Sequence, residues 1–153
     1  MKKISFIIIL FSLSFLSTNA QKPGKKQNKE CCSVVAKTYH RVLLHLASAD
    51  TLAHKALINQ LNGLKEAFGD SASVEVVVHG PGLDFLIAAK STQKENISKA
   101  TANGVKFFAC ENTMKARKVT KEEILPQIGF VKFGMAEMVL KQEEGWTYIK
   151  TGF

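Results

Sequence analysis

One cysteine, Cys110, stands where a parallel α/β sheet would place its chemistry. It ends the segment 104–110, which reads as a short apolar strand, and the polar residues after it can open a helix. Open α/β sheets bind their ligands at the carboxyl ends of the strands. The thiolate is the reactive form of cysteine, and helix N-termini or nearby cations lower the thiol pKa from about 8.5 to roughly 3.5–7.5. Any chemistry of this protein is therefore expected at Cys110.

Polar residues near this cysteine in the expected fold could assist it. Asn112 or Thr113 could cap the helix, so that its first amides face the sulfur, and they could also donate hydrogen bonds to an anionic sulfur. His79 ends another expected strand and could supply a proton or a positive charge. Glu111 acts in the opposite direction, because a nearby carboxylate disfavours the thiolate. A buried, inert Cys110 and a His79 that only hydrogen-bonds its own turn are the alternatives.

The Gly80-Pro81-Gly82 turn directly follows His79. Gly80 and Gly82 could let a ligand approach the backbone, and a turn that needs positive φ explains them equally well. The turn lacks the spacing of a dinucleotide or P-loop fingerprint, so no nucleotide is predicted.

The other histidines give no metal-site pattern. His45 lies inside an apolar strand and is expected to be a satisfied core residue, whereas His40 and His54 are expected to face solvent. No spacing of His, Cys and Asp matches a metal site, and no cofactor is expected.

Alternating strand and helix patterns position these residues. Strands are expected at 41–47, 73–79, 105–109, 128–133 and 146–149. Helices are expected at 51–68, 83–90, 92–103, after Thr120, and at 134–144. These lengths imply parallel strands joined by crossovers, so the predicted architecture is a three-layer α/β/α sandwich with a mainly parallel five-stranded sheet. The carboxyl ends of neighbouring strands would then bring His79 and Cys110 together.

Local signals place the helix ends. Asp50 suits the start of the first helix and Gly69 its end. Capping boxes are expected at 92–95 and 120–123. In the last helix, Met135, Met138 and Val139 are expected to point inward.

The first residues are typical of a targeting segment. Lys2 and Lys3, the apolar run 4–16 and the small-residue site 18–20 predict a signal peptide over 1–20, cut before Gln21. Residues 21–33 are rich in lysine and predict a basic flexible linker, followed by one α/β domain over 34–153. The protein is therefore expected to be exported, periplasmic or secreted, with no stable membrane span after cleavage. The basic residues behind the net charge of +8 do not form a stripe with interleaved aromatic residues, which argues against nucleic-acid binding.

Three cysteines are too few for a disulfide scaffold. Cys31 and Cys32 lie beside the expected linker, where they could act as resolving thiols for Cys110 or have no role. An odd number of cysteines in an exported protein leaves at least one thiol free, mixed or paired between chains.

Three segments together resemble the DsrE/DsrF-like sulfur-relay family: 78–82 (VHGPG), 104–114 (GVKFFACENTM) and 143–148 (EEGWTY). The resemblance covers nearly all of residues 41–153. It implies a Rossmann-like domain that assembles into trimers or hexamers, with a persulfide carried at Cys110. The export signal and the tail with Cys31 and Cys32 depart from the well-studied members.

The expected function is therefore handling of sulfane sulfur through a persulfide on Cys110, with His79 assisting and Asn112, Thr113, Gly80 and Gly82 binding. Whether the protein is a sulfurtransferase or a sulfur carrier stays open, and the partner is a sulfur donor or acceptor, either small molecule or protein. The alternative is a non-enzymatic homo-oligomeric module that binds a small ligand or a partner and has an inert cysteine. A third hypothesis is thiol–disulfide exchange between Cys110 and Cys31 or Cys32.

Overall fold

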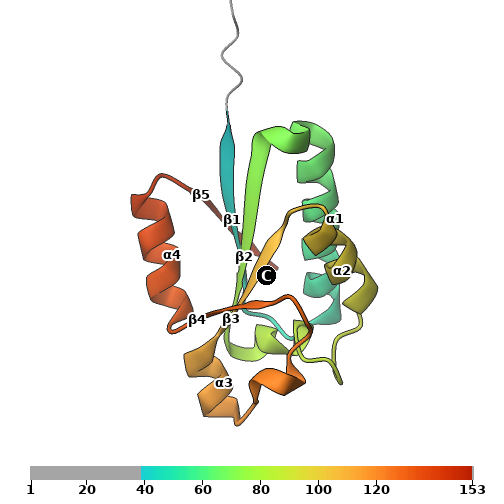
Figure 1. Ribbon diagram of the computed structural model, residues 1–153, viewed down its shortest axis with the longest axis vertical. Coiled ribbons are helices and arrows are strands. Elements are labelled where there is room, and N and C mark those ends of the chain that lie inside the picture. The colour runs from blue at the N-terminus through green and yellow to red at the C-terminus, as the bar shows by residue number, and fades with distance from the viewer. Residues whose placement is uncertain (1–38, 153) are drawn as a thin grey trace, which may run out of the picture. The chain divides into compact units, whose positions relative to one another are not determined.

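Five parallel strands form the centre of the fold (Figure 1). The structure is a computed structural model that describes residues 39–152. Its strands are β1 (His40–Leu46), β2 (Ala72–Val78), β3 (Lys106–Cys110), β4 (Gly129–Val131) and β5 (Thr147–Thr151), in the order β4-β3-β2-β1-β5. All four pairings are parallel. This confirms the predicted α/β fold with a parallel five-stranded sheet, whereas the expected signal peptide, the linker, Cys31 and Cys32 lie outside the described residues.

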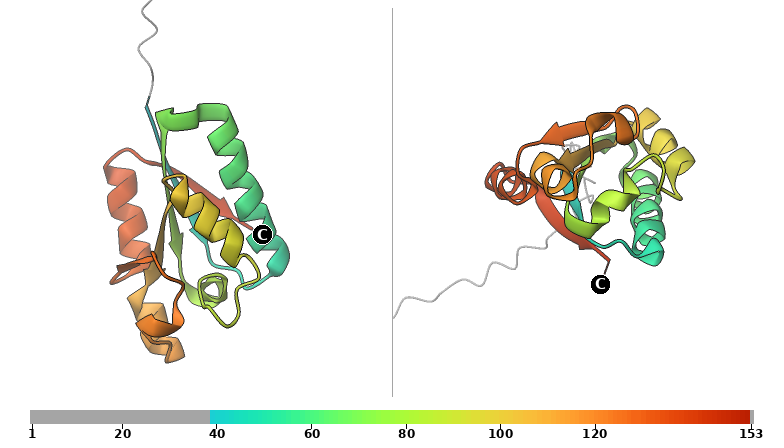
Figure 2. Two further views of the ribbon diagram at one scale, coloured as in Figure 1. Left: turned by 45° about the vertical axis from the view of Figure 1, so that its right-hand side comes forward. Right: turned by 90° about the horizontal axis from the view of Figure 1, so that it is seen from below.

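Helices cover both faces of the sheet. The β1–β2 and β2–β3 crossovers step across it in one direction, and the β4–β5 crossover returns in the other. Right-handed connections therefore place α1 (Thr51–Phe68) and α2 (Lys94–Ala102) on one face and α4 (Gly134–Glu143) on the other. Both views of Figure 2 show the sheet between these two helical layers.

The larger core lies between the sheet and α1. Leu57 and Leu61 of α1 are buried against Leu44 and Val76 of the sheet. Burying each such side chain contributes about 1.5–3 kcal/mol. His54 was expected to face solvent, and this is wrong: it is 3% exposed and its Nε2 lies 2.9 Å from the Ser48 carbonyl oxygen. The reason is that residue 54 falls on the inward face of α1, next to Ala53 and Leu57. His40 is half-buried, with its ring 4.2 Å from that of Phe68.

A smaller core lies under α4. Met138 packs there on Leu43 and Val77. Next to it, Glu75 of β2 is buried and forms an ion pair of 2.9 Å with Lys141 of α4. The expectation that Met135 and Val139 point inward is wrong, because only one narrow stripe of α4, containing Gly134 and Met138, faces the sheet. Met135 and Val139 are each about half exposed.

The predicted helix ends are partly confirmed. The Asp50 carboxylate accepts the Leu52 amide at 2.8 Å, and Gly69 follows α1 with a φ of 54°. The capping box of Thr120 and Glu123 is present on a short 3-10 helix, η3 (Lys121–Glu123).

Two expectations about the segment after the Gly-Pro-Gly turn are wrong. The box at 92–95 does not form, because the Ser91 hydroxyl and the buried Gln93 organise the turn and α2 starts only at Lys94. The helix expected at 83–90 is instead a 3-10 helix, η2 (Gly80–Phe85), followed by turns.

In Figure 1 the carboxyl ends of the strands lie at the bottom, beside η2 and α3 (Glu111–Arg117). Within residues 39–152, no helix is long and apolar enough to span a membrane.

Candidate functional site

Cys110 is the last residue of β3 and the N-cap of α3. Asn112 or Thr113 was expected to cap this helix, and this is wrong. Both lie in its first turn, because the strand passes into the helix without a loop. The cysteine is 2% exposed, and the backbone amide of Gly134 donates to its Sγ at 3.2 Å. The start of α4 therefore closes directly over the sulfur.

The hydrogen bonds around the sulfur favour its anionic form. Burial alone would raise the pKa of the Cys110 thiol, but the Gly134 amide, the Thr113 hydroxyl and amide, and the Asn112 amide act against it and leave the pKa lowered. Of these, the Asn112 amide also donates to the Lys132 carbonyl at 3.1 Å, so its contribution is shared. Gly134 and Thr113 are the donors that matter most.

Thr113 links the sulfur to the glycine turn. Its Oγ1 accepts the Gly80 amide at 3.0 Å, which leaves the hydroxyl proton free to point at the Cys110 sulfur. Two of the predicted site segments are thus joined through one hydroxyl group.

The turn after His79 needs its glycines for structural reasons. Gly80 has a φ of 56°, which side chains rarely adopt. Gly82 is buried against the end of β1, where an added Cβ would lie 2.7 Å from the Leu46 carbonyl oxygen. The space at Gly82 is therefore filled by backbone, which explains the glycine without a ligand.

Arg117 fixes the turn to α3, a role that the sequence did not indicate. Its guanidinium donates to the Gly80 carbonyl at 3.2 Å and to the Asp84 carboxylate at 2.6 Å. Partial burial acts to raise the pKa of Asp84, but Arg117 and Lys90 outweigh it and hold that pKa below its usual value.

A row of aromatic side chains leads away from the cysteine across the sheet. Val78 pairs with Ala109, so the next residues, His79 and Cys110, stand side by side on neighbouring strands. His79 Nε2 lies 2.7 Å from His45 Nε2, and His45 Nδ1 lies 2.7 Å from the Tyr148 hydroxyl. The two imidazole rings stack at 12° with their centroids 4.7 Å apart.

Gly134 is where the cysteine and this row meet. A Cβ placed on Gly134 would lie 3.4 Å from the Cys110 Cβ and 3.5 Å from the His79 Cβ. The predicted proximity of His79 and Cys110 therefore holds in the fold, although no direct hydrogen bond joins their side chains in the described part of the chain.

The participation of His45 and Tyr148 was missed from the sequence. The prediction that His45 is a satisfied core residue is right, since it is 7% exposed and both its ring nitrogens are bonded. Its partners follow only from strand order, because β5 lies beside β1 and not beside β4. The sequence carries no signal for that order.

The side chain of Asn112, unlike its backbone amide, lies outside the hydrogen-bonded cluster. This exposed side chain lines a shallow cavity of about 490 Å³ beside the turn, together with Thr113, Asp84 and Arg117. In residues 39–152, no three His, Cys, Asp or Glu side chains are grouped as a metal site would require.

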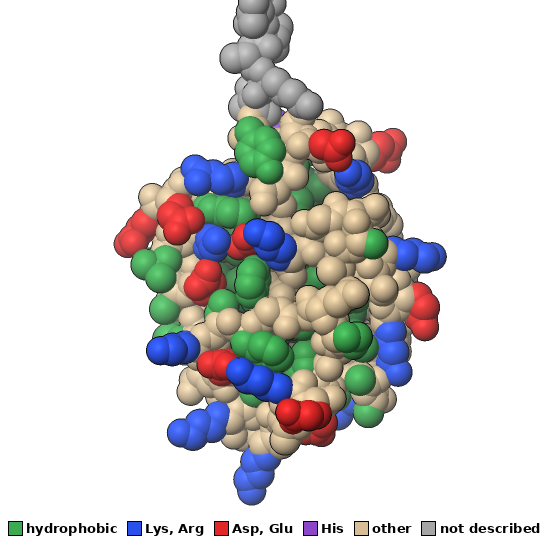
Figure 3. Space-filling model, viewed as in Figure 1, with side chains coloured by type: hydrophobic (Ala, Val, Ile, Leu, Met, Phe, Trp, Pro, Cys, Tyr) green, Lys and Arg blue, Asp and Glu red, His purple; other side chains and the backbone are tan. Residues whose placement is uncertain are grey.

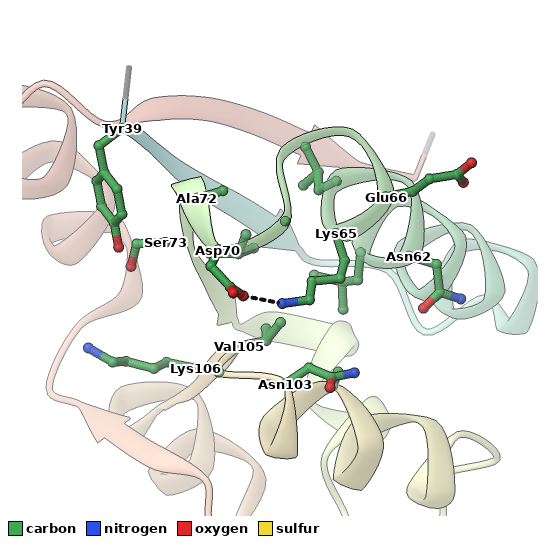
Figure 4. A pocket seen from close by; sticks show the side chains of 16 residues that line it. Tyr39, Asn62, Lys65, Glu66, Asp70, Ala72, Ser73, Asn103, Val105 and Lys106 are labelled. Carbon is green, nitrogen blue, oxygen red and sulfur yellow. Dashed lines mark hydrogen bonds and ion pairs between the residues drawn. The ribbon is translucent and has the colours of Figure 1, made fainter. Parts of the chain in front are cut away.

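A larger cavity, of about 640 Å³, opens at the opposite, amino edge of the sheet (Figure 4). Lys65 and Asp70 form an ion pair of 2.7 Å inside it, and Tyr39 and Lys106 lie at its side. By cavity size alone, the amino edge of the sheet would be the better candidate for a binding site. The carboxyl edge is the better candidate site, because parallel sheets bind ligands there and the polarised thiol lies there.

Comparison with known proteins places the chain in one family. A sequence model of the DsrE/DsrF-like family matches residues 36–151. One similar solved structure is described as a protein of unknown function, MTH1491 from Methanobacterium thermoautotrophicum. It is 31% identical over 72% of this chain and 98% of its own, with a TM-score of 0.69. No curated protein matches.

Proposed function

Because the chain belongs to the DsrE/DsrF-like family, we propose that it handles sulfane sulfur by holding it as a persulfide on Cys110. The observation that carries this proposal is the set of donors around the sulfur, which lowers the pKa of the thiol although the residue is buried. Thiols with a lowered pKa are the reactive ones, and reactive groups cluster at functional sites.

The reaction divides into two sulfur transfers. The Cys110 thiolate attacks the outer sulfur of a persulfide or polysulfide donor, R–S–SH; the new S–S bond forms on Cys110, the S–S bond of the donor breaks, and R–S⁻ leaves and takes up a proton. In the second transfer, an acceptor thiol loses its proton and attacks the outer sulfur of Cys110–S–SH, which restores the Cys110 thiolate. The sulfur atom moves without net oxidation, so no further oxidant or reductant is needed.

The site residues have separate tasks in this scheme. The Gly134 amide and the Thr113 hydroxyl stabilise the anionic sulfur, because both already donate to it. His79 lies beside the cysteine and supplies the proton to the leaving sulfur. Gly80 orients Thr113, and Asn112 faces the adjoining cavity, where part of a donor could bind.

Access to the sulfur requires movement of one segment. Cys110 is only 2% exposed, and residues 132–134 cover it while Phe133 is half exposed. A donor reaches the sulfur when this segment swings away, which breaks the hydrogen bonds of Gly134 to Cys110 and of Asn112 to Lys132 and uncovers the cysteine.

The test is intact-mass analysis of the full chain after treatment with polysulfide or thiosulfate. We expect an adduct with the mass of one sulfur atom, which is lost on reduction and absent from Cys110→Ser. The matched control changes both Cys31 and Cys32 to serine, leaves Cys110 as the sole thiol of the chain, and should keep the adduct. An adduct that persists unchanged in Cys110→Ser would contradict the proposal.

We also propose that the protein is exported to a periplasmic or extracellular compartment. The support is the charged, apolar and small-residue order of 1–20. The same mass measurement on protein from the natural envelope tests this, since cleavage leaves a chain that begins at Gln21, and a chain that still begins at Met1 would speak against it.

A second candidate is a homo-oligomeric binding module with an inert cysteine. The burial of Cys110 favours it, because small buried thiols are often only core residues. We further infer that a second copy of the chain covers the outer face of α4. This "α4 apolar face" consists of Phe133, Met135, Val139 and Leu140, each about half exposed. Binding and assembly that survive Cys110→Ser, with no adduct in the wild type, would select this candidate.

A further inference from the structure

The hydrogen-bonded row of Tyr148, His45 and His79 leads from the surface to His79, which stands beside the cysteine. His45 sits in the middle, 7% exposed, and both its nitrogens are engaged at 2.7 Å. Tyr148 is 37% exposed on the outer strand β5, so its hydroxyl is in reach of water. At the other end, the Nδ1 of His79 has no hydrogen-bond partner within residues 39–152.

The row has two hydrogen-bonding arrangements, because a neutral imidazole has one donor and one acceptor nitrogen. In the first, the Tyr148 hydroxyl donates to His45 Nδ1, His45 Nε2–H donates to His79 Nε2, and His79 carries its proton on Nδ1. In the second, every bond is reversed: His79 Nε2–H donates to His45, His45 Nδ1–H donates to the tyrosine oxygen, and His79 Nδ1 is bare. His79 is therefore an acid at Nδ1 in one arrangement and a base in the other.

We propose that Tyr148 and His45 are positioning residues that exchange protons between solvent and His79 while sulfur is transferred at Cys110. This inference rests on the proposed function and goes beyond it by assigning a role to two residues away from the sulfur. Neither residue contacts the reacting atoms. Both act by setting which nitrogen of His79 carries the proton.

The two arrangements match the two sulfur transfers. When a donor is cleaved, His79 Nδ1–H gives its proton to the leaving R–S⁻, His45 passes one to His79 Nε2, Tyr148 passes one to His45, and water restores the tyrosine proton. One proton enters at Tyr148 and one leaves at His79. When the acceptor thiol attacks, His79 Nδ1 takes its proton, the row shifts back and Tyr148 releases one proton to water. The cycle therefore ends where it began.

Burial, with the charges around the row, keeps both imidazoles neutral, which this exchange requires. Burial, His79 and Lys150 of β5 lower the pKa of His45 from 6.5 to about 4, and burial lowers the pKa of His79. On α4, which covers this face, the half-buried charged residues are Glu137 and Lys141, and Lys141 is paired with Glu75. On β3 the group beside His79 is the Cys110 thiol. At neutral pH both imidazoles are thus uncharged and carry one N–H each, and one of these two protons lies in the hydrogen bond between the rings.

The experiment measures the rate of persulfide formation on Cys110 in the full chain with polysulfide, across pH and buffer concentration. Tyr148→Phe keeps the ring and removes the hydroxyl, and His45→Gln keeps a polar group without passing a proton. General acid–base assistance typically contributes 10²–10⁴-fold. Because His79 itself remains in both variants, we expect each to lose only part of this and to slow the reaction about tenfold to a hundredfold. We also expect added imidazole buffer to restore the rate of both variants, which a purely structural defect would not allow. The matched control is Tyr39→Phe, which changes the other tyrosine, at the amino edge of the sheet.

The outcomes separate this inference from the proposed function. A wild-type adduct whose rate is unchanged in Tyr148→Phe, or is lowered without rescue by imidazole, overturns the proton exchange and leaves the persulfide in place. Absence of the adduct in the wild type overturns both. Imidazole ¹⁵N spectra test the row without sulfur: Tyr148→Phe should shift the His45 nitrogens and Tyr39→Phe should not, and unshifted His45 signals would also overturn the inference.

Discussion

At the scale of single residues, Cys110 is shaped by two opposing effects on one atom. Burial disfavours a charged sulfur, while the Gly134 amide and the Thr113 hydroxyl favour it, and the pKa of the thiol ends below its ordinary value. The same contacts that polarise the sulfur also cover it. Reactivity and access are therefore coupled through Gly134, which must move for a donor to enter.

His45 makes the stability of the fold depend on pH. Its pKa falls from 6.5 to about 4 on folding, so between these values the unfolded chain binds more protons than the folded one. The free energy of unfolding therefore rises with pH in this window. The contribution of His45 is fully present above about pH 6.5 and is lost as the pH falls toward about 4. The lowered pKa of His79 acts in the same direction.

Urea unfolding between about pH 4 and pH 7 checks this dependence. His45→Gln should remove up to about one proton from the slope of unfolding free energy against pH. His40→Gln, at the start of the same strand, is the control. An equal slope in wild type and His45→Gln would show that His45 does not titrate as described.

At the scale of elements, the turn between β2 and η2 depends on a close backbone approach. An alanine Cβ at Gly82 would stand 2.7 Å from the Leu46 oxygen and 3.0 Å from the Ala47 Cα. Backbone cannot move aside as a flexible side chain can, so Gly82→Ala should lower the free energy of unfolding by about 1–3 kcal/mol or more. Chemical denaturation measures the change.

Gly63 provides the matched control for that substitution. It lies inside α1, and an added Cβ there meets nothing within 4 Å. Gly63→Ala should therefore stabilise the protein by up to about 1 kcal/mol, because alanine is the better helix former. If both substitutions changed the free energy of unfolding in the same direction, the clash at Gly82 would not explain the effect of Gly82→Ala.

Much of the element layout could be predicted from the sequence, because its signals are local. The cap at Asp50, the glycine after α1 and the box at Thr120 are each decided by a few neighbouring residues. Strand ends also predicted that His79 and Cys110 meet. The predictions failed where contacts between residues distant in sequence determine the structure. Gln93 is buried and α2 starts only after it, and His54 is buried on the inward face of α1.

The rest of the site depends on strand order, which local patterns do not contain. His45 and Tyr148 touch because β5 returns to the far edge of the sheet beside β1. Gly134 reaches the sulfur because α4 begins under the carboxyl edge. Both contacts join segments far apart in sequence, so periodicity and capping signals could not reveal them.

At the scale of the whole molecule, charge and apolar surface are distributed differently. On the face shown in Figure 3, basic and acidic side chains are interspersed, with no area of a single sign. Hydrophobic side chains also reach the surface over α4, at the left of that view. The α4 apolar face adjoins the segment that covers Cys110, so a second copy docked there would bear on access to the sulfur.

Assembly through the α4 apolar face can be tested by sedimentation of the full chain. Val139 and Leu140 are 52% and 53% exposed, so covering the exposed half of each would contribute about 0.8–1.5 kcal/mol to association. A double change of Val139 and Leu140 to lysine should therefore weaken the oligomer about tenfold to a hundredfold. Leu52→Lys is the control, because Leu52 is 69% exposed on α1, on the other face of the sheet. An oligomer that is lost with Leu52→Lys and kept with the α4 double change would move the interface to the α1 side, and a monomeric wild type would exclude assembly through either helix.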